Sequence, residues 1–295
     1  MGDPIHSDLA APLAEAGGVV MMIGAPDTGK TTFSRMVIGS ALALGRTVAY
    51  VDSDLAHPTV GPPTCVGLKW LRSTDDLATM ASADDLRFVG EIAPDRFRLP
   101  QVAAVASLVD SARAEADLIV IDTSGTISGV TGQTLKYHKV ELARPDVVVA
   151  FQRGSEMEPL VGLLRRFLAA EVMTVATPGG VIPMSPEERM ELRASGFRQA
   201  LREPLQSWRV RSTVFAPSLP AGFDLSRLDR LIVGIHDRTG RCLGLGVLES
   251  EETGLRVRTS SAEGMAGLRI GSARLDPERF HTTTVNLREV MFGLE

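Results

Sequence analysis

The chain has 295 residues, a formal net charge of −5, and 44% hydrophobic and 23% charged residues. This length fits one large α/β domain and a smaller second one, and the composition is typical of a soluble protein. The negative charge excludes a global attraction to nucleic acid or anionic membranes, so any nucleic-acid contact depends on a local basic cluster. The two cysteines lie far apart in the sequence, which favours a reducing, cytoplasmic location.

Short apolar strands alternate with helical segments through the first two thirds of the chain. Residues 1–17 are expected to be a mobile leader or a short cap. Strands are expected at 19–23, 47–51, 117–121, 147–151 and 173–176, and helices at 30–44, 101–115, 134–142, 158–170 and 185–202. This alternation predicts an α/β fold with a mostly parallel sheet flanked by helices. No apolar run is long enough to span a bilayer, so we expect no membrane partner.

The pattern changes beyond Pro204. Short strands at 231–236, 242–248 and 255–259 surround glycine-rich turns, and long helices are absent. We therefore predict a first domain at 18–204, with a lid helix near 185–202, and a small, mostly β domain at 205–295.

The glycine-rich segment GAPDTGKTT follows the first strand and begins the first helix. Its Gly-x4-Gly-Lys-Thr spacing fits the P-loop pattern in the context that this motif requires. The backbone N–H groups and the helix N-terminus can surround phosphates, Lys30 can reach the β- and γ-phosphates, and the hydroxyl of Thr31 can bind Mg²⁺. The expected nucleotide-binding residues are Gly24, Ala25, Pro26, Asp27, Thr28, Gly29, Lys30, Thr31 and Thr32. The segment therefore predicts a P-loop NTPase that binds ATP, with GTP left open, and Mg²⁺.

Acidic residues follow the second and third strands, as Asp52-Ser53-Asp54 and as Asp122-Thr123-Ser124-Gly125. In α/β sheets, ligands bind at the carboxyl ends of the strands. A carboxylate there can hold Mg²⁺ or accept the proton of an attacking hydroxyl, whereas the alternative is a loop or cap carboxylate. The position of the pair Asp52/Asp54 favours a functional role.

A helix with two arginines is expected near residues 185–202. Ser185, Pro186 and Glu188 form a helix-start pattern. Arg189 and Arg193 lie four residues apart and share one side of this helix. They can close over a triphosphate and offset charge during transfer, although the spacing alone also fits a solvated basic face.

Taken in order, four segments resemble the polynucleotide 5′-hydroxyl kinases of RNA processing, those related to the kinase subunit of the eukaryotic pre-mRNA cleavage complex. The segments are GAPDTGKTT, VDSDLAHPTVGPPTCVGL, IDTSGTISGVTGQTLKYHKVELARPDVVV and RMELRASGFRQAL. The run LIVGIHDRTGRCLGLGVLE is similar to the small β domain that some members carry. The resemblance covers about residues 18–290.

The resemblance implies transfer of the γ-phosphate of ATP to the 5′-hydroxyl of single-stranded or end-exposed RNA or DNA. It makes Lys30, Asp54, Arg189 and Arg193 the catalytic residues, with Asp54 as the base that activates the hydroxyl. Thr31 and Asp54 are the expected metal ligands. The residues expected to bind the substrate are Asp52, His57, Thr123, Ser124 and Gly125, of which Thr123 and Gly125 form a clasp near the phosphates and the acceptor.

Two departures from the family pattern affect the acceptor side. His57 stands where the family has Gln, and Thr126 stands where eukaryotic members have Trp. Loss of that aromatic removes a surface on which a base can stack, and such stacking contributes ~1–3 kcal/mol of binding free energy per base.

The residues alone leave two other functions open. One is a nucleotide-bound scaffold or binding module of an RNA-processing assembly, and the other is a P-loop kinase acting on a small metabolite. A GTPase-like switch is disfavoured because the chain has no Asn-Lys-x-Asp segment. Protein partners and the choice between RNA and DNA are not specified.

Overall fold

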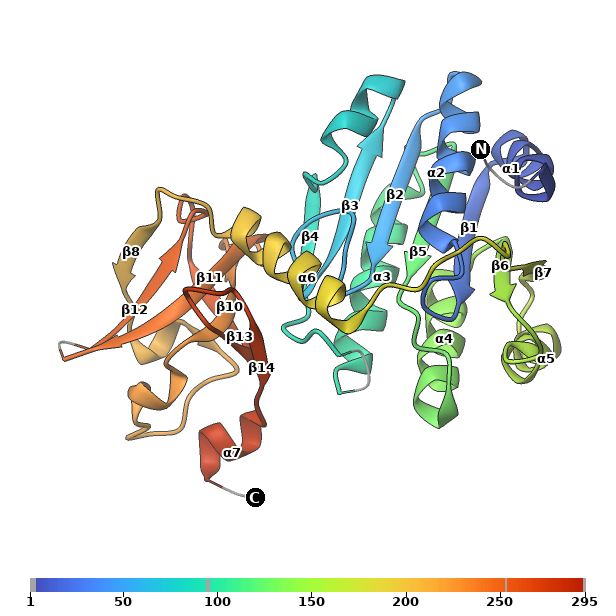
Figure 1. Ribbon diagram of the computed structural model, residues 1–295. Helices are drawn as coiled ribbons and strands as arrows, with labels where there is room; N and C mark the ends of the chain where they lie inside the picture. The colour runs from blue at the N-terminus through green and yellow to red at the C-terminus, as the bar shows by residue number, and fades with distance from the viewer. Residues whose placement is uncertain (1–3, 94–95, 253, 294–295) are drawn as a thin grey trace.

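The computed structural model describes residues 4–93, 96–252 and 254–293 and contains two seven-stranded sheets (Figure 1). In the first sheet the strand order is β4-β3-β2-β5-β1-β6-β7. Its strands are β1 (Gly18–Gly24), β2 (Val48–Ser53), β3 (Cys65–Leu71), β4 (Asp85–Phe88), β5 (Leu118–Thr123), β6 (Val147–Gln152) and β7 (Glu171–Ala176). Strands β1, β2, β5, β6 and β7 are parallel, while β3 and β4 run antiparallel at one edge. The α/β fold with a mostly parallel sheet is confirmed.

Helices cover both faces of the first sheet. They are α1 (Pro4–Ala16), α2 (Lys30–Ala43), α3 (Arg98–Ala112), α4 (Gly129–Ala143) and α5 (Glu158–Phe167). The side chains of β1 alternate between two apolar cores, with Met21 packing toward α3, α4 and α5 and Met22 toward α1 and α2. Because both faces are covered, the central strands are mostly apolar up to their carboxyl ends, which made them recognisable in the sequence.

Two segments differ from the sequence-based expectation. Much of the segment expected to be a leader or cap forms α1, which packs on α2 and buries Ala10 and Leu13. Residues 67–100, interpreted as mixed with polar loops, contain most of β3 and all of β4, with the 3₁₀ turn η1 (Thr74–Thr79) between them. These strands form because each pairs with a neighbouring strand of the sheet. Gly67 lets the preceding loop cross β3, because a Cβ at this position would lie 2.5 Å from the carbonyl oxygen of Val60.

The second sheet is mostly antiparallel, with the order β14-β13-β10-β11-β12-β8, and β9 pairs with β13. Its strands are β8 (Gln206–Arg209), β9 (Phe215–Ala216), β10 (Leu231–His236), β11 (Cys242–Glu251), β12 (Gly254–Thr259), β13 (Gly267–Leu275) and β14 (Thr282–Thr284). Two 3₁₀ turns, η2 (Ser212–Val214) and η3 (Leu225–Leu228), and the short helix α7 (Leu287–Phe292) complete this part. The expected strands at 231–236, 242–248 and 255–259 correspond to β10, β11 and β12.

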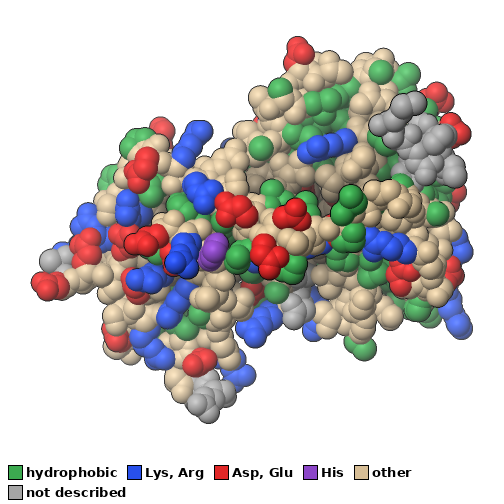
Figure 2. All heavy atoms as spheres, in the orientation of Figure 1, with side chains coloured by type: hydrophobic (Ala, Val, Ile, Leu, Met, Phe, Trp, Pro, Cys, Tyr) green, Lys and Arg blue, Asp and Glu red, His purple; other side chains and the backbone are tan. Residues whose placement is uncertain are grey.

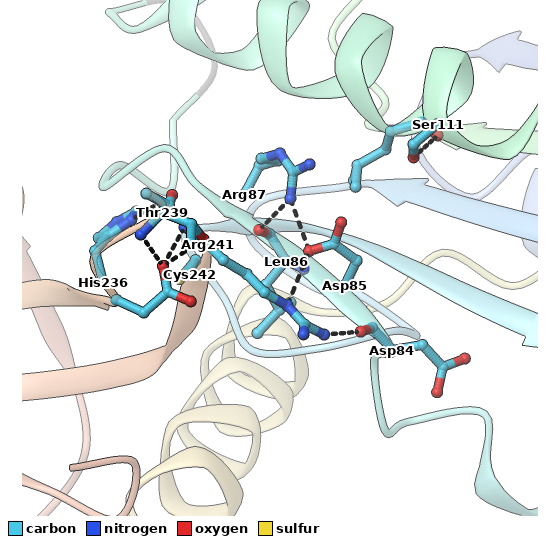
Figure 3. Close-up of polar contacts among 12 residues, drawn as sticks. Asp84, Asp85, Leu86, Arg87, Ser111, His236, Thr239, Arg241 and Cys242 are labelled. Carbon is cyan, nitrogen blue, oxygen red and sulfur yellow. Dashed lines mark hydrogen bonds and ion pairs between the residues drawn. The ribbon is translucent and has the colours of Figure 1, made fainter. Parts of the chain in front are cut away.

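Helix α6 (Pro186–Ala200) lies between the two sheets (Figure 1). An apolar cluster joins Phe88 of β4, Phe197 of α6 and Ile232 of β10. At the same junction Arg241 donates to the carbonyl oxygen of Asp84 at 2.7 Å, and Arg87 pairs with Asp85 at 2.7 Å (Figure 3). The proposed boundary near residue 204 follows α6 and precedes β8. None of the described helices is long and apolar enough to cross a membrane.

Candidate active site

A cavity of about 550 Å³ lies at the carboxyl ends of β1, β2 and β5. The P-loop, the turn after β2, the turn after β5 and the start of α6 meet there. Of the residues expected to form the site, the cavity is lined by Pro26, Asp27, Thr28, Gly29, Lys30, Thr31, Thr32, Asp52, Asp54, His57, Thr123, Ser124, Gly125 and Arg189. Gly24 and Ala25 lie at the base of the loop, and Arg193 reaches the cavity through its contact with His57.

The P-loop folds around the start of α2. Gly29 has φ +91° and directly precedes this helix, in a conformation that glycine adopts without strain. The ammonium of Lys30 donates to the carbonyl oxygen of Ala25 at 2.7 Å. Burial lowers the pKa of Lys30, and the carboxylates of Asp122, Asp54 and Asp27 oppose that effect. The loop therefore places a buried cation and a helix N-terminus at one position, which suits a polyphosphate.

Arg153, in the turn after β6, also holds the P-loop. Its Nη2 donates to the carbonyl oxygens of Pro26 at 3.2 Å and Asp27 at 2.5 Å. The sequence offered no motif for this contact, because it joins segments more than a hundred residues apart. Arg153 therefore fixes the outer side of the loop.

Asp122, the penultimate residue of β5, faces the first turn of α2. The hydroxyl of Thr31 donates to its Oδ2 at 2.6 Å, and the hydroxyl of Tyr50 reaches the same oxygen at 3.1 Å. Burial raises the pKa of Asp122, against the lowering effects of the Thr31 hydrogen bond and the charge of Lys30. In the sequence, an acid at the end of an apolar strand marks this position, but no specific role was predicted for Asp122. A hydroxyl and a carboxylate together fit Mg²⁺, which takes one or two protein oxygens alongside phosphates and water.

Asp52 and Asp54 shape the turn after β2. Asp52 is buried and accepts hydrogen bonds from the backbone N–H groups of Asp54 at 2.9 Å, Thr59, and Val60 at 3.2 Å. Burial, with Asp122 nearby, raises the pKa of Asp52 well above its ordinary value. Asp52 was expected to bind substrate, yet both of its carboxylate oxygens are engaged with the backbone of this turn. Asp54 accepts from the N–H of Ala56 at 2.9 Å through Oδ1 and itself lines the cavity.

The lid helix begins with the capping box that the sequence predicts. Glu188 N–H donates to Ser185 Oγ at 3.1 Å, and Ser185 N–H donates to a Glu188 carboxylate oxygen at 2.7 Å. The arginines that follow diverge, because Arg189 pairs with Asp27 of the P-loop while Arg193 Nη2 lies 3.5 Å from His57 Nε2. Arg189 therefore contacts the phosphate-binding side of the cavity, and Arg193 contacts the side with the acidic turn.

The first half of α6 carries opposite charge on its two faces. Glu187, Glu188 and Glu191 are exposed, and Figure 2 shows acidic side chains gathered over this helix. Arg189 and Arg193 are partly buried toward the cavity and the acidic turn. An anionic ligand is therefore attracted to the inner side of the lid and repelled by its outer side.

His57 and the segment expected to form a clasp also line the cavity. Burial lowers the pKa of His57, and the positive charges of Arg193 and Arg189 lower it further, while the carboxylate of Asp54 opposes these effects. The imidazole is therefore neutral near pH 7. Gly125 packs directly on the P-loop, because a Cβ there would lie 2.5 Å from the backbone nitrogen of Pro26. A larger residue at this position would displace either the clasp or the loop.

The fold and the site define a P-loop nucleotide-binding protein. The model of the mRNA cleavage and polyadenylation factor CLP1 P-loop family matches residues 24–201, which is more than half of the chain. The chain belongs to this family.

Curated relatives and a solved structure agree with that assignment. The chain is 27% identical to a polyribonucleotide 5′-hydroxyl-kinase of Pyrococcus abyssi and 25% identical to one of Methanocaldococcus jannaschii. Each comparison covers 87% of this chain and 87% of the relative. In the solved structure of the wild-type Clp1p–Pcf11p complex, one chain matches with a TM-score of 0.72 and 15% identity, over 91% of this chain and 77% of that chain. This similarity shows a shared fold.

Proposed function

We propose that this protein is an ATP-dependent polynucleotide 5′-hydroxyl kinase that transfers the γ-phosphate to the 5′-hydroxyl of RNA or DNA. The observation that carries the proposal is the meeting, in one cavity, of the P-loop with Lys30, the pair Thr31–Asp122, the acid Asp54 and the lid residue Arg189. The names of the archaeal relatives support the same activity.

The chain supplies positioning and charge for this reaction. The P-loop binds the triphosphate, and Lys30 and Arg189 lie where they can offset charge on the transferring phosphoryl group. Thr31 and Asp122, with Asp54 nearby, are the residues that would hold Mg²⁺. When bound, this ion neutralises negative charge on the phosphates.

Asp54 is the proposed base. It accepts the proton of the 5′-hydroxyl as the new oxygen–phosphorus bond forms and the bond to the β-phosphate oxygen breaks, which releases ADP. Its Oδ1 already accepts from the turn at Ala56, so the carboxylate is held in a fixed orientation beside the cavity. His57, Thr123, Ser124 and Gly125 line the same cavity and are the proposed contacts for the acceptor end.

The test is transfer of labelled γ-phosphate to 5′-hydroxyl RNA, 5′-hydroxyl DNA and a mononucleotide. Lys30→Ala and Asp54→Asn should each lower transfer by about 10²-fold or more, because each removes a group that acts on the reacting atoms. Asp75→Asn is the matched control, since Asp75 is exposed and lies outside the cavity lining.

The alternatives give different results in this assay. Full activity of Asp54→Asn would remove Asp54 as the base. Tight nucleotide binding without transfer to any acceptor would favour a scaffold, and transfer to a small acceptor that single-stranded RNA does not compete away would favour a metabolite kinase.

A further inference from the structure

Two lysines of α4 are buried beneath the cavity and have no part in the mechanism above. Lys136 and Lys139 are fully buried, although charged side chains are rarely found in protein interiors. The chain has only four lysines, and a third one, Lys30, lines the same cavity. Such a concentration of buried cations requires partners, and the contacts of both lysines lead to the active-site turns.

Lys136 holds the clasp. Its ammonium donates to the hydroxyl of Thr123 at 2.7 Å and to the carbonyl oxygen of Ser124 at 2.5 Å. The hydroxyl of Thr123 in turn donates to the carbonyl oxygen of Met22 in β1 at 2.8 Å. Gly125, the next residue of the clasp, rests on Pro26 of the P-loop. Lys136 therefore connects α4 to the clasp at the point where the clasp meets the P-loop.

Lys139 holds the acidic turn. Its ammonium donates to the hydroxyl of Ser53 at 2.9 Å, and Ser53 lies between the two acids Asp52 and Asp54. The hydroxyl of Ser53 donates to the carbonyl oxygen of Asp122 at 2.9 Å. The carbonyl oxygen of Ser53 accepts from the side chain of Gln101 at 2.9 Å. One buried lysine thus connects the ends of both acidic strands.

Burial and neighbouring charges act together on both lysines. Burial lowers the pKa of Lys139 to about 7, although the carboxylates of Asp54, Asp52 and Asp122 favour its charged form. Burial, together with the neighbouring Lys139 and Lys30, lowers the pKa of Lys136 well below its ordinary value. Lys139 is therefore mostly a cation only below about pH 7.

We propose that Lys136 and Lys139 are positioning residues for phosphoryl transfer. Lys136 fixes the clasp against the P-loop, and Lys139, through Ser53, fixes the turn that carries Asp54. The effect on catalysis rests on the proposed kinase function, whereas the structural role can be measured without it.

The experiment compares Lys136→Met, Lys139→Met, Lys139→Arg and Ser53→Ala with the wild-type protein. Ser53→Ala removes the contact of Lys139 but keeps its charge. Lys69→Met is the matched control, because Lys69 is also nearly buried, pairs with Asp84 at 3.1 Å and does not line the cavity. Backbone hydrogen exchange in the presence of Mg²⁺ and ADP reports the order of each turn, and steady-state transfer to a 5′-hydroxyl oligonucleotide gives kcat and KM.

Distinct changes are expected in each variant. Lys136→Met should speed exchange at residues 122–128, and both Lys139→Met and Ser53→Ala should speed it at residues 52–58, by about tenfold or more. Both methionine variants should lower kcat by about 10–100-fold with KM for ATP within about threefold. Ser53→Ala should lower kcat in the same direction as Lys139→Met, because it removes the contact of Lys139 with the acidic turn. Lys139→Arg keeps a hydrogen-bond donor at this position and should stay closer to the wild-type protein in both exchange and kcat.

Several results would overturn the proposal. The first is exchange and turnover in the lysine variants equal to those of Lys69→Met. The second is a fall in turnover with no change in exchange at either turn. If Lys139→Met does not fold, Ser53→Ala and Lys139→Arg decide the same question. Failure of the wild-type protein to phosphorylate any oligonucleotide would reject the kinase function, and the exchange results would still decide whether the lysines hold these turns.

Discussion

Arg189 and Arg193 lie one helical turn apart on α6, yet they contact different sides of the cavity. Arg189 pairs with Asp27 in the P-loop, and Arg193 lies beside His57 in the acidic turn. Burial lowers the pKa of Arg193, while the carboxylate of Asp54 opposes that effect. The two side chains are therefore expected to act on different reactants.

Substitution of each arginine should change a different kinetic constant. Arg189→Ala should lower kcat by about 10²-fold, because it removes a charge beside the transferring group. Arg193→Ala should mainly raise KM for the oligonucleotide, by about 5–20-fold. The measurement is steady-state transfer with ATP and the oligonucleotide varied in turn. Arg198→Ala, on the exposed side of the same helix, is the control, and equal effects of the first two variants on one constant would contradict this division.

Lys139 should also make the stability of the protein depend on pH. Its pKa is about 7 when folded and near 10.5 when unfolded. Between those values the unfolded chain binds more protons, so the free energy of unfolding rises with pH, by at most about 1.4 kcal/mol per pH unit from this residue. Urea unfolding from about pH 7 to about pH 9 should therefore show the wild-type protein gaining stability relative to Lys139→Met. A difference between the two proteins that stays constant with pH would show that Lys139 titrates normally.

At the scale of elements, α6 touches the proline-rich loop after β2 through Gly196. A Cβ at Gly196 would lie 2.9 Å from Cδ and 3.0 Å from Cγ of Pro63, a ring that cannot move aside easily. This close approach sets the position of the lid over the acidic turn.

Gly196→Ala should therefore shift the lid. Alanine is favoured over glycine inside helices by about 1 kcal/mol, but the contact with Pro63 opposes this gain. We expect no increase in thermal stability and a several-fold higher KM for the oligonucleotide. Gly162→Ala in α5 is the matched control, since nothing lies within 4 Å of its Cβ position, and it should stabilise the protein by about 0.5–1 kcal/mol. Equal stabilisation by both substitutions would argue against a lid seated on Pro63.

Elements with a strong local signal were predictable from the sequence. The P-loop, the buried parallel strands and the capping box of α6 each depend on residues close together in the chain. Strands β3 and β4, the antiparallel pair at one side of the sheet, were missed because they form through pairing with strands distant in the sequence or with each other, and Asp122 gained its role only through its contact with Thr31. The burial of Lys136 and Lys139 could not be predicted, because their acceptors lie on β2, on β5 and in the turn after β5.

At the scale of the whole molecule, Phe88 joins the two sheets. Its ring fills a space left by three glycines, and a Cβ at Gly234 of β10 would lie 2.4 Å from its Cγ. Phe88 is buried in the cluster that also contains Phe197 of the lid helix. The second sheet is therefore expected to unfold together with the first.

Phe88→Ala should uncouple the two sheets. Loss of the ring leaves a cavity between them and should cost about 3–5 kcal/mol. The two tryptophans lie in different sheets, Trp70 in β3 and Trp208 in β8. In variants that keep a single tryptophan, its fluorescence therefore follows the unfolding of one sheet in urea. The transitions should coincide in the parent protein and separate after Phe88→Ala. Leu108→Ala, which opens a cavity in the first sheet's core alone, should lower stability with both transitions still coincident. Coincident transitions in Phe88→Ala would mean that other contacts, such as Arg241 with Asp84, suffice to couple the sheets.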